Sequence, residues 1–100
     1  MKKELEPDLS GVAPPLGLSV PLQALWWLKK GGFQLGAEWK KAHGLCQQNE
    51  GERARDLVHA LCHWVEGDAS NRDYWYRRIQ GWNRATDFAQ EWQQIWTALN

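Results

Sequence analysis

Residues 52–66 read ERARDLVHALCHWVE, and this stretch carries the clearest structural signal in the chain. Its apolar side chains recur at Ala54, Leu57, Val58, Leu61 and Val65. That spacing places them on one face of an amphipathic α-helix. Gly67 follows directly and favours a helix stop. The stretch therefore predicts a helix from about Glu52 to Glu66 that packs through its leucine–valine face.

Four further helices are predicted from apolar periodicity and from residues that favour helix ends. They cover about residues 19–30, 35–48, 70–82 and 86–100. The expected N-caps are Ser19, Ser70 and Thr86. Because the connections are short, the predicted fold is all-α: a compact array of four to five antiparallel helices.

The composition is typical of one globular domain, with 43% hydrophobic and 24% charged residues in 100. Eight residues are tryptophan, which predicts a Trp-rich core, with a ligand-stacking role as the alternative. Residues 1–18 contain three of the four prolines and predict an extended or poorly ordered arm. Residues 19–100 are then expected to form a single helical domain.

The charge balance argues against two classes of partner. Twelve basic and twelve acidic residues give a formal net charge of zero. A neutral chain lacks the positive surface of a nucleic-acid or anionic-membrane binder, so neither partner is expected. Only two cysteines are present, too few for a disulfide framework, which favours a reducing, cytoplasmic location. No cofactor is expected.

A candidate metal site lies on the predicted helix at residues 52–66. His59 and His63 are four residues apart and Glu66 follows three residues later, so one helix face offers three metal ligands. At about 100° of rotation per residue, this face lies roughly 140–200° from Leu61. We therefore expect the imidazoles to face outward, on a metal-binding, solvated or second packing face.

A larger ligand set is suggested by the spacing H-x2-C-x12-H-x3-H of His43, Cys46, His59 and His63. This spacing resembles the two-cysteine, two-histidine zinc finger with its first cysteine replaced by His43. The aromatic residue and leucine that such a finger needs are replaced by Glu50 and Asp56. Cys46 also belongs to the apolar stripe of its own helix, so the four side chains are not expected to share one ion.

Residues 59–78, HALCHWVEGDASNRDYWYRR, hold the densest group of polar and aromatic side chains. The pattern H-x3-H-x2-E-G-D-x2-N-x2-Y-W-Y-R-R resembles a family of small bacterial and fungal proteins of unknown activity. The resemblance covers about a fifth of the chain and implies a shared local structure. The local pattern also resembles the helical hairpin of a single tetratricopeptide repeat, at Gly67, Asp68, Tyr74 and Tyr76.

The same segment supplies a candidate ligand-binding set. We expect Arg78 to lie near the buried side and to pair with Glu66 or Asp68, since a buried guanidinium needs a carboxylate. An internal network is one interpretation. The other is a site for an anion or small polar ligand, formed by His59, His63, Glu66, Asp68, Asn71, Tyr76 and Arg78.

The leading functional prediction is a non-enzymatic helical interaction module that binds a protein partner or forms a homodimer. This prediction rests on the apolar stripe of the last predicted helix, which includes Phe88, Trp92 and Trp96. The apolar area of the stripe is expected to exceed what a small core can cover. The alternative is a small-ligand-binding protein or a metal-dependent enzyme that uses His59, His63 and Glu66. No catalytic residue is assigned.

Overall fold

The computed structural model describes residues 7–48 and 51–100. Within these residues the regular secondary structure is entirely helical, and the predicted fold class is confirmed. The described part of the chain forms five helices: α1 (Val20–Lys30), α2 (Ala37–Gln47), α3 (Arg53–Glu66), α4 (Ala69–Arg77) and α5 (Phe88–Leu99).

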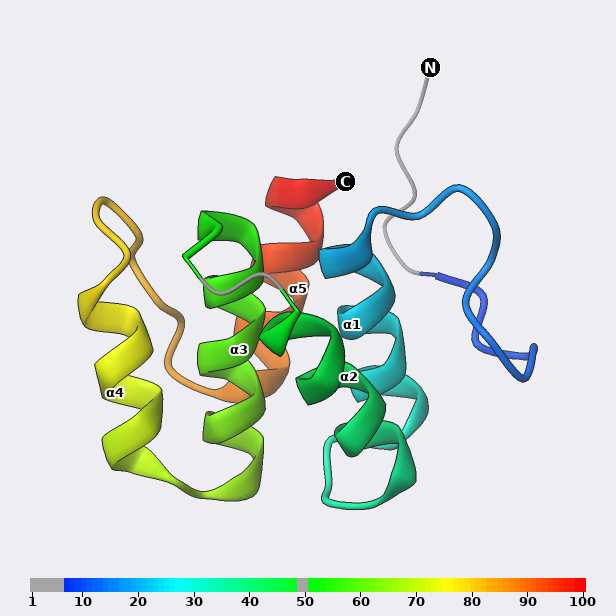
Figure 1. Ribbon diagram of the computed structural model, residues 1–100, viewed down its shortest axis with the longest axis horizontal. Helices are drawn as coiled ribbons and strands as arrows, with labels where there is room; N and C mark the ends of the chain where they lie inside the picture. Colours follow the sequence, from blue (N-terminus) through cyan, green and yellow to red (C-terminus); the bar gives the residue numbers. More distant parts are fainter. Residues whose placement is uncertain (1–6, 49–50) are drawn as a thin grey trace.

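The first four helices alternate in direction, and α3 stands at the centre of the array (Figure 1). Residues 78–87 then run back along the molecule, so α5 starts at the same end as α4 and is parallel to it (Figure 1). α3 packs against α1, α2, α4 and α5. This central position decides how much of its surface reaches solvent.

Burial of α3 extends around the whole helix. Residues 56–63 are all buried, and they include Asp56, His59 and His63 besides the apolar side chains. An amphipathic helix on a surface buries one stripe, whereas a central helix is covered on several faces. The leucine–valine face of α3 packs into the main core. The other faces of α3 are covered by α2 and α4.

Tryptophans form much of the core, as predicted. Trp26, Trp92 and Trp96 are at most 1% exposed. Trp92 and Trp96 stack with ring centroids 5.3 Å apart, and Trp92 Nε1 donates a hydrogen bond to the carbonyl oxygen of Leu25 at 2.7 Å. The α5 stripe is thus covered by α1 and α3 of the same chain. Its apolar area is no longer a reason to expect self-association, which stays a prediction.

The helix ends differ from the sequence expectation at two caps. Asp68, rather than Ser70, caps α4, and its side chain accepts a hydrogen bond from the Asn71 backbone N–H. Asp87, rather than Thr86, caps α5 in the same way. In each case an aspartate directly before the first helical residue reaches the third backbone N–H, which is the geometry of an N-cap.

A buried carboxylate ties the 78–87 segment to α5. Glu91 is 0% exposed, and its side chain accepts hydrogen bonds from Tyr76 Oη at 2.6 Å, Trp82 Nε1 at 2.8 Å and the Ala85 backbone N–H at 2.9 Å. The pKa of the Tyr76 phenol is raised above its ordinary value, mainly by burial and to a smaller extent by the hydrogen bond to Glu91. The phenol therefore stays a donor at neutral pH.

Residues 7–18 precede α1 without forming a helix, and the first six residues of the predicted arm lie outside the described part of the chain. Two backbone carbonyls attach this segment to α1: Asp8 accepts from Trp26 Nε1 at 2.9 Å, and Leu9 accepts from Lys30 Nζ at 2.6 Å. Among residues 7–48 and 51–100, no helix combines the length and apolar character needed to cross a membrane.

Candidate functional site

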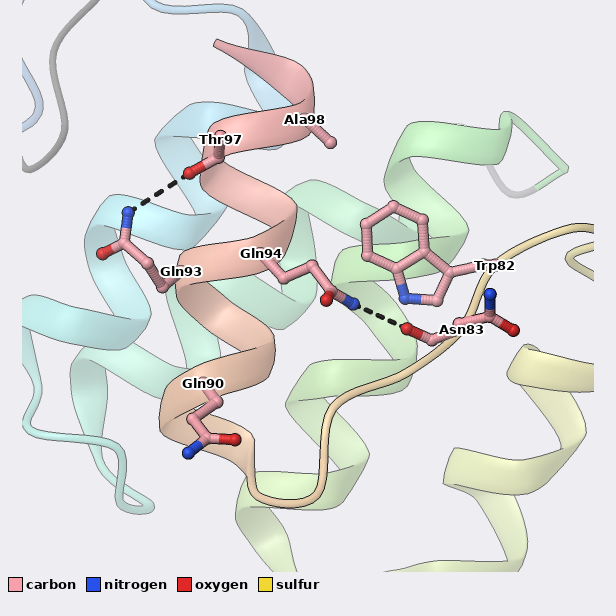
Figure 2. Close-up of a pocket in the computed structure, with 7 residues that line it drawn as sticks. All are labelled: Trp82, Asn83, Gln90, Gln93, Gln94, Thr97 and Ala98. Carbon is pink, nitrogen blue, oxygen red and sulfur yellow. Dashed lines mark hydrogen bonds between the residues drawn. The ribbon is translucent and has the colours of Figure 1, made fainter.

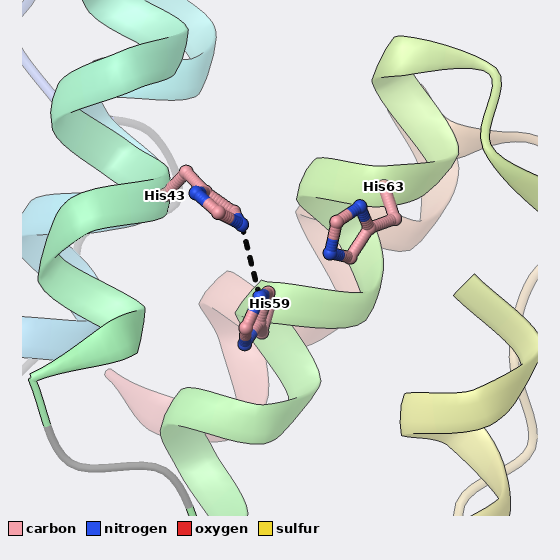
Figure 3. A group of neighbouring side chains, drawn as sticks. All are labelled: His43, His59 and His63. Atoms are coloured by element: carbon pink, nitrogen blue, oxygen red, sulfur yellow. Dashed lines mark hydrogen bonds between the residues drawn. The ribbon is translucent and has the colours of Figure 1, made fainter. Parts of the chain in front are cut away.

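All three histidines of the chain meet at one place between α2 and α3 (Figure 3). His43 comes from α2, and His59 and His63 come from successive turns of α3. One ring nitrogen from each lies within 4.8 Å of the others. His43 Nε2 and His59 Nε2 are 3.0 Å apart, and the His59 and His63 rings stack at 5.0 Å between centroids.

The turn between α2 and α3 explains how His43 joins the pair on α3. The two helices run in opposite directions and pack against each other (Figure 1). In an antiparallel helix pair with a short connection, residues at equal sequence distance from that connection lie at about the same level. His43 and His59 both lie eight residues from Gly51 in the sequence, so the hairpin places them opposite one another.

The expectation that the α3 imidazoles face outward is wrong. His59 is 2% exposed and His63 is 8% exposed. Both imidazoles lie on the helix face opposite Leu61, as the sequence predicts, but neighbouring helices cover that face. α2 and α4 close this face, so it is a second packing face on which the histidines are enclosed.

Aromatic rings form two walls of the histidine cluster. Trp39 of α2 stacks on His43, with centroids 4.8 Å apart and planes 10° from parallel. Trp75 of α4 stacks on His59, with centroids 4.3 Å apart and planes 24° from parallel. Trp39 Nε1 also donates a hydrogen bond to the Cys62 carbonyl at 2.8 Å, which fixes α2 against α3.

Glu66 determines which nitrogen of His63 points into the cluster. Its Oε2 atom lies 2.6 Å from His63 Nδ1, so Nδ1 carries a proton and donates it. In the neutral ring, Nε2 is then left with a lone pair. Figure 3 shows one ring nitrogen of His63 directed toward His43 and His59. The arrangement is that of a carboxylate that orients a metal-ligating histidine.

His59 is held in its neutral form. Its pKa is lowered from 6.5 to about 4, mainly by burial and to a smaller extent by the nearby charges of His43 and His63. Its Nδ1 atom is buried and has no hydrogen-bond partner among the described residues. Such unsatisfied buried groups are rare and are often explained by an ion, an ordered water or a functional role.

The remaining predicted site residues separate into three environments. Asp68 lies close to His63 and Glu66, and its carboxylate accepts hydrogen bonds from the backbone and side chain of Asn71. Tyr76 instead faces Glu91. Arg78 is exposed and donates to Tyr74 Oη at 3.2 Å.

The expected ion pair of Arg78 with Glu66 or Asp68 is not among the ion pairs of the described residues. Helix α4 ends at Arg77, so Arg78 follows the helix and is not on its buried side. The guanidinium instead lies over the ring of Trp75, 5.3 Å from its centroid. Arg78 therefore contacts Trp75, which flanks the histidine cluster, rather than the carboxylate of Glu66.

The two cysteines lie in the core, away from the metal-ligand positions of the imidazoles. Cys46 and Cys62 are both free and at most 1% exposed. Among the described residues, the sets that can surround one metal ion contain no cysteine.

A separate groove with a volume of about 630 Å³ lies on the outer face of α5 (Figure 2). Its lining side chains are uncharged and include no histidine: Trp82, Asn83, Gln90, Gln93, Gln94, Thr97 and Ala98. Gln93 and Gln94 are already engaged, with Thr97 Oγ1 and the Asn83 carbonyl respectively (Figure 2). The groove offers no metal ligand or acid–base group, so the histidine cluster is the stronger candidate.

No protein-family model, curated protein or solved structure matches this chain.

Proposed function

We propose that this protein binds one divalent transition-metal ion of the zinc class through His43, His59 and His63. The observation that supports the proposal is the convergence of every histidine in the chain, from two different helices, in one cluster in which His59 and His63 are buried and His43 is half-buried. The proposal keeps the metal-binding alternative of the sequence analysis, with His43 as the third ligand in place of Glu66.

The spacing of the ring nitrogens suits this class of ion. Two imidazole nitrogens about 2.0–2.1 Å from a tetrahedral zinc ion lie about 3.3 Å apart. His43 Nε2 and His59 Nε2 are 3.0 Å apart, so ligation requires a small separation of these two atoms. One ring nitrogen of His63 lies within 4.8 Å of the ligand nitrogens of His43 and His59.

The donor set narrows the choice of metal. Imidazole suits zinc, copper, iron and nickel, whereas magnesium and calcium prefer oxygen ligands. Glu66 is engaged with His63 Nδ1 and supports a ligand instead of providing one. Three protein nitrogens leave a fourth tetrahedral position for water or a substrate, as in catalytic zinc sites.

Metal binding on this scheme also joins α2 to α3. His43 is attached to one helix, and His59 and His63 to the other, so an ion between them acts as a cross-link. An ion that binds only the folded chain stabilises it by about 2.7 kcal/mol at a free concentration 100 times its Kd. Affinity and thermal stability are therefore expected to rise together.

The test is a Zn²⁺ titration of untagged, chelator-treated protein in competition with a chromophoric chelator. We expect one ion per chain with a Kd below about 1 μM, and at least a hundredfold weaker binding for each of His43→Ala, His59→Ala and His63→Ala. Glu66→Gln is expected to weaken binding about 10–100-fold. Glu38→Gln, on the first turn of α2, is the control that leaves binding unchanged.

Two results would contradict the proposal. One is wild-type binding no tighter than that of the three His→Ala variants, because the histidines would then contribute nothing to the site. The other is unchanged affinity in His43→Ala, because the ion would then be held by His59, His63 and Glu66, as the sequence alone suggested.

A further inference from the structure

We infer that Trp75 is a positioning residue of the histidine site, and that its indole face holds the His59 ring in the orientation for ligation. The inference rests on the proposed metal-binding function and assigns a role to the aromatic half of the 59–78 sequence pattern.

The need for such a residue follows from the hydrogen bonds of the cluster. A metal-ligating histidine usually donates its second ring N–H to a carboxylate, a carbonyl or a water, which fixes the rotation of the ring. His63 has this support from Glu66 Oε2 at 2.6 Å. His59 lacks it, because its Nδ1 atom has no partner in the described part of the chain.

Stacking supplies the missing constraint. The Trp75 and His59 rings are 4.3 Å apart between centroids and 24° from parallel, and His63 stacks on His59 at 5.0 Å. His59 therefore lies in contact with two flat rings. Rotation of the imidazole out of this arrangement would lose the ring contact with Trp75 and the 3.0 Å contact of His59 Nε2 with His43 Nε2.

Trp75 is itself firmly placed. It is 8% exposed, and the Tyr74 ring meets it edge-on at 5.1 Å. The Arg78 guanidinium lies 5.3 Å from its centroid and also donates to Tyr74 Oη, so it braces both rings. A guanidinium over an indole is a favourable cation–π contact.

This chain of contacts explains why the two halves of the 59–78 pattern occur together. The first half supplies His59, His63 and Glu66 on α3, and the second half supplies Trp75 and Arg78 from α4 and its C-cap. Asp68 caps α4 directly after the α3 stop at Gly67, which sets the hairpin that brings Trp75 onto His59. The second half of the pattern thus supports the site without touching the ion.

The experiment compares Trp75→Leu, which keeps an apolar side chain but removes the flat face, with Trp75→Phe, which restores a ring. Trp64→Leu is the matched control on the same α3–α4 hairpin, because Trp64 packs against Tyr76 and Arg72. Binding is measured with Co²⁺, whose visible absorption reports ligand geometry. Metal-free samples are measured by NMR for the ring-current shift of the His59 ring protons.

We expect Trp75→Leu to weaken Co²⁺ binding about tenfold and to change the visible spectrum, as loss of an outer-shell partner does. Trp75→Phe is expected to restore affinity to within about threefold, and Trp64→Leu to leave affinity and spectrum unchanged. The upfield shift of His59 ring protons is expected in wild type and absent in Trp75→Leu.

The inference is overturned if Trp75→Leu binds Co²⁺ with wild-type affinity and spectrum, or if Trp64→Leu weakens binding equally. Failure of the wild-type protein to bind Co²⁺ overturns the proposed function and this inference with it. The metal-free NMR spectra then still decide separately whether the Trp75–His59 stack forms.

Discussion

Acidification is expected to destabilise the metal-free protein through His59. Burial lowers the pKa of this imidazole from 6.5 to about 4 in the folded protein. In the unfolded chain the group titrates near 6.5, so between these two values the unfolded state binds more protons than the folded state. The contribution of neutral His59 to the free energy of unfolding is therefore complete above about pH 6.5. It is lost as the pH falls toward 4.

The magnitude follows from the gap between the two pKa values. At about 1.4 kcal/mol for each pH unit, the gap from 6.5 to about 4 amounts to about 3 kcal/mol in total. About 2 kcal/mol of this is expected to be lost between pH 7 and pH 5. For a domain of this size, whose unfolding free energy is typically about 5–15 kcal/mol, that is a large fraction.

The assay is urea unfolding of chelator-treated protein at pH 7 and pH 5, for wild type and for His59→Phe. Phenylalanine keeps a flat ring against Trp75 and does not titrate, so the variant is expected to lose about 2 kcal/mol less than wild type over this interval. His59→Gln is a second non-titrating variant in case the phenyl ring does not fit. An equal pH dependence in wild type and both variants would refute the assignment of the burial effect to His59.

Three further predictions concern the structure around the site. Glu91→Leu leaves the donors of Tyr76 and Trp82 unpaired in the interior and is expected to cost about 3–5 kcal/mol in urea unfolding, whereas a loss under 1 kcal/mol would contradict the buried network. Asp68→Ala removes the α4 N-cap and is expected to cost about 1 kcal/mol, with no change meaning that the cap bond is not formed in solution. Cys62 is buried and its pKa is raised, so thiol reagents are expected to label it only after denaturation, and rapid labelling of the native protein would be inconsistent with this.

Much of the fold is readable from the sequence because its helices are strongly patterned. The apolar spacing of residues 52–66 predicts α3 to within one residue at its start and gives its end at Glu66. The Gly31–Gly32 pair correctly ends α1 at Lys30. The caps of α4 and α5 are less certain from sequence because Asp, Ser and Thr compete as capping residues within a few positions.

The candidate site is only half readable, for a reason that lies in tertiary packing. A helical pattern identifies the apolar face of α3, but it does not say whether the opposite face is covered by neighbouring helices. For that reason His59 and His63 are recognised as a pair but not as buried. The signal that was missed is the equal distance of His43 and His59 from Gly51, which a helical hairpin converts into contact.

The most direct measurement of the metal-site proposal is X-ray absorption at the zinc edge of protein loaded with one equivalent of Zn²⁺. Coordination by His43, His59 and His63 predicts three imidazole nitrogens at about 2.0–2.1 Å and one further light atom in the fourth position. A sulfur neighbour at about 2.3 Å, or fewer than three imidazoles around the ion, would contradict the account.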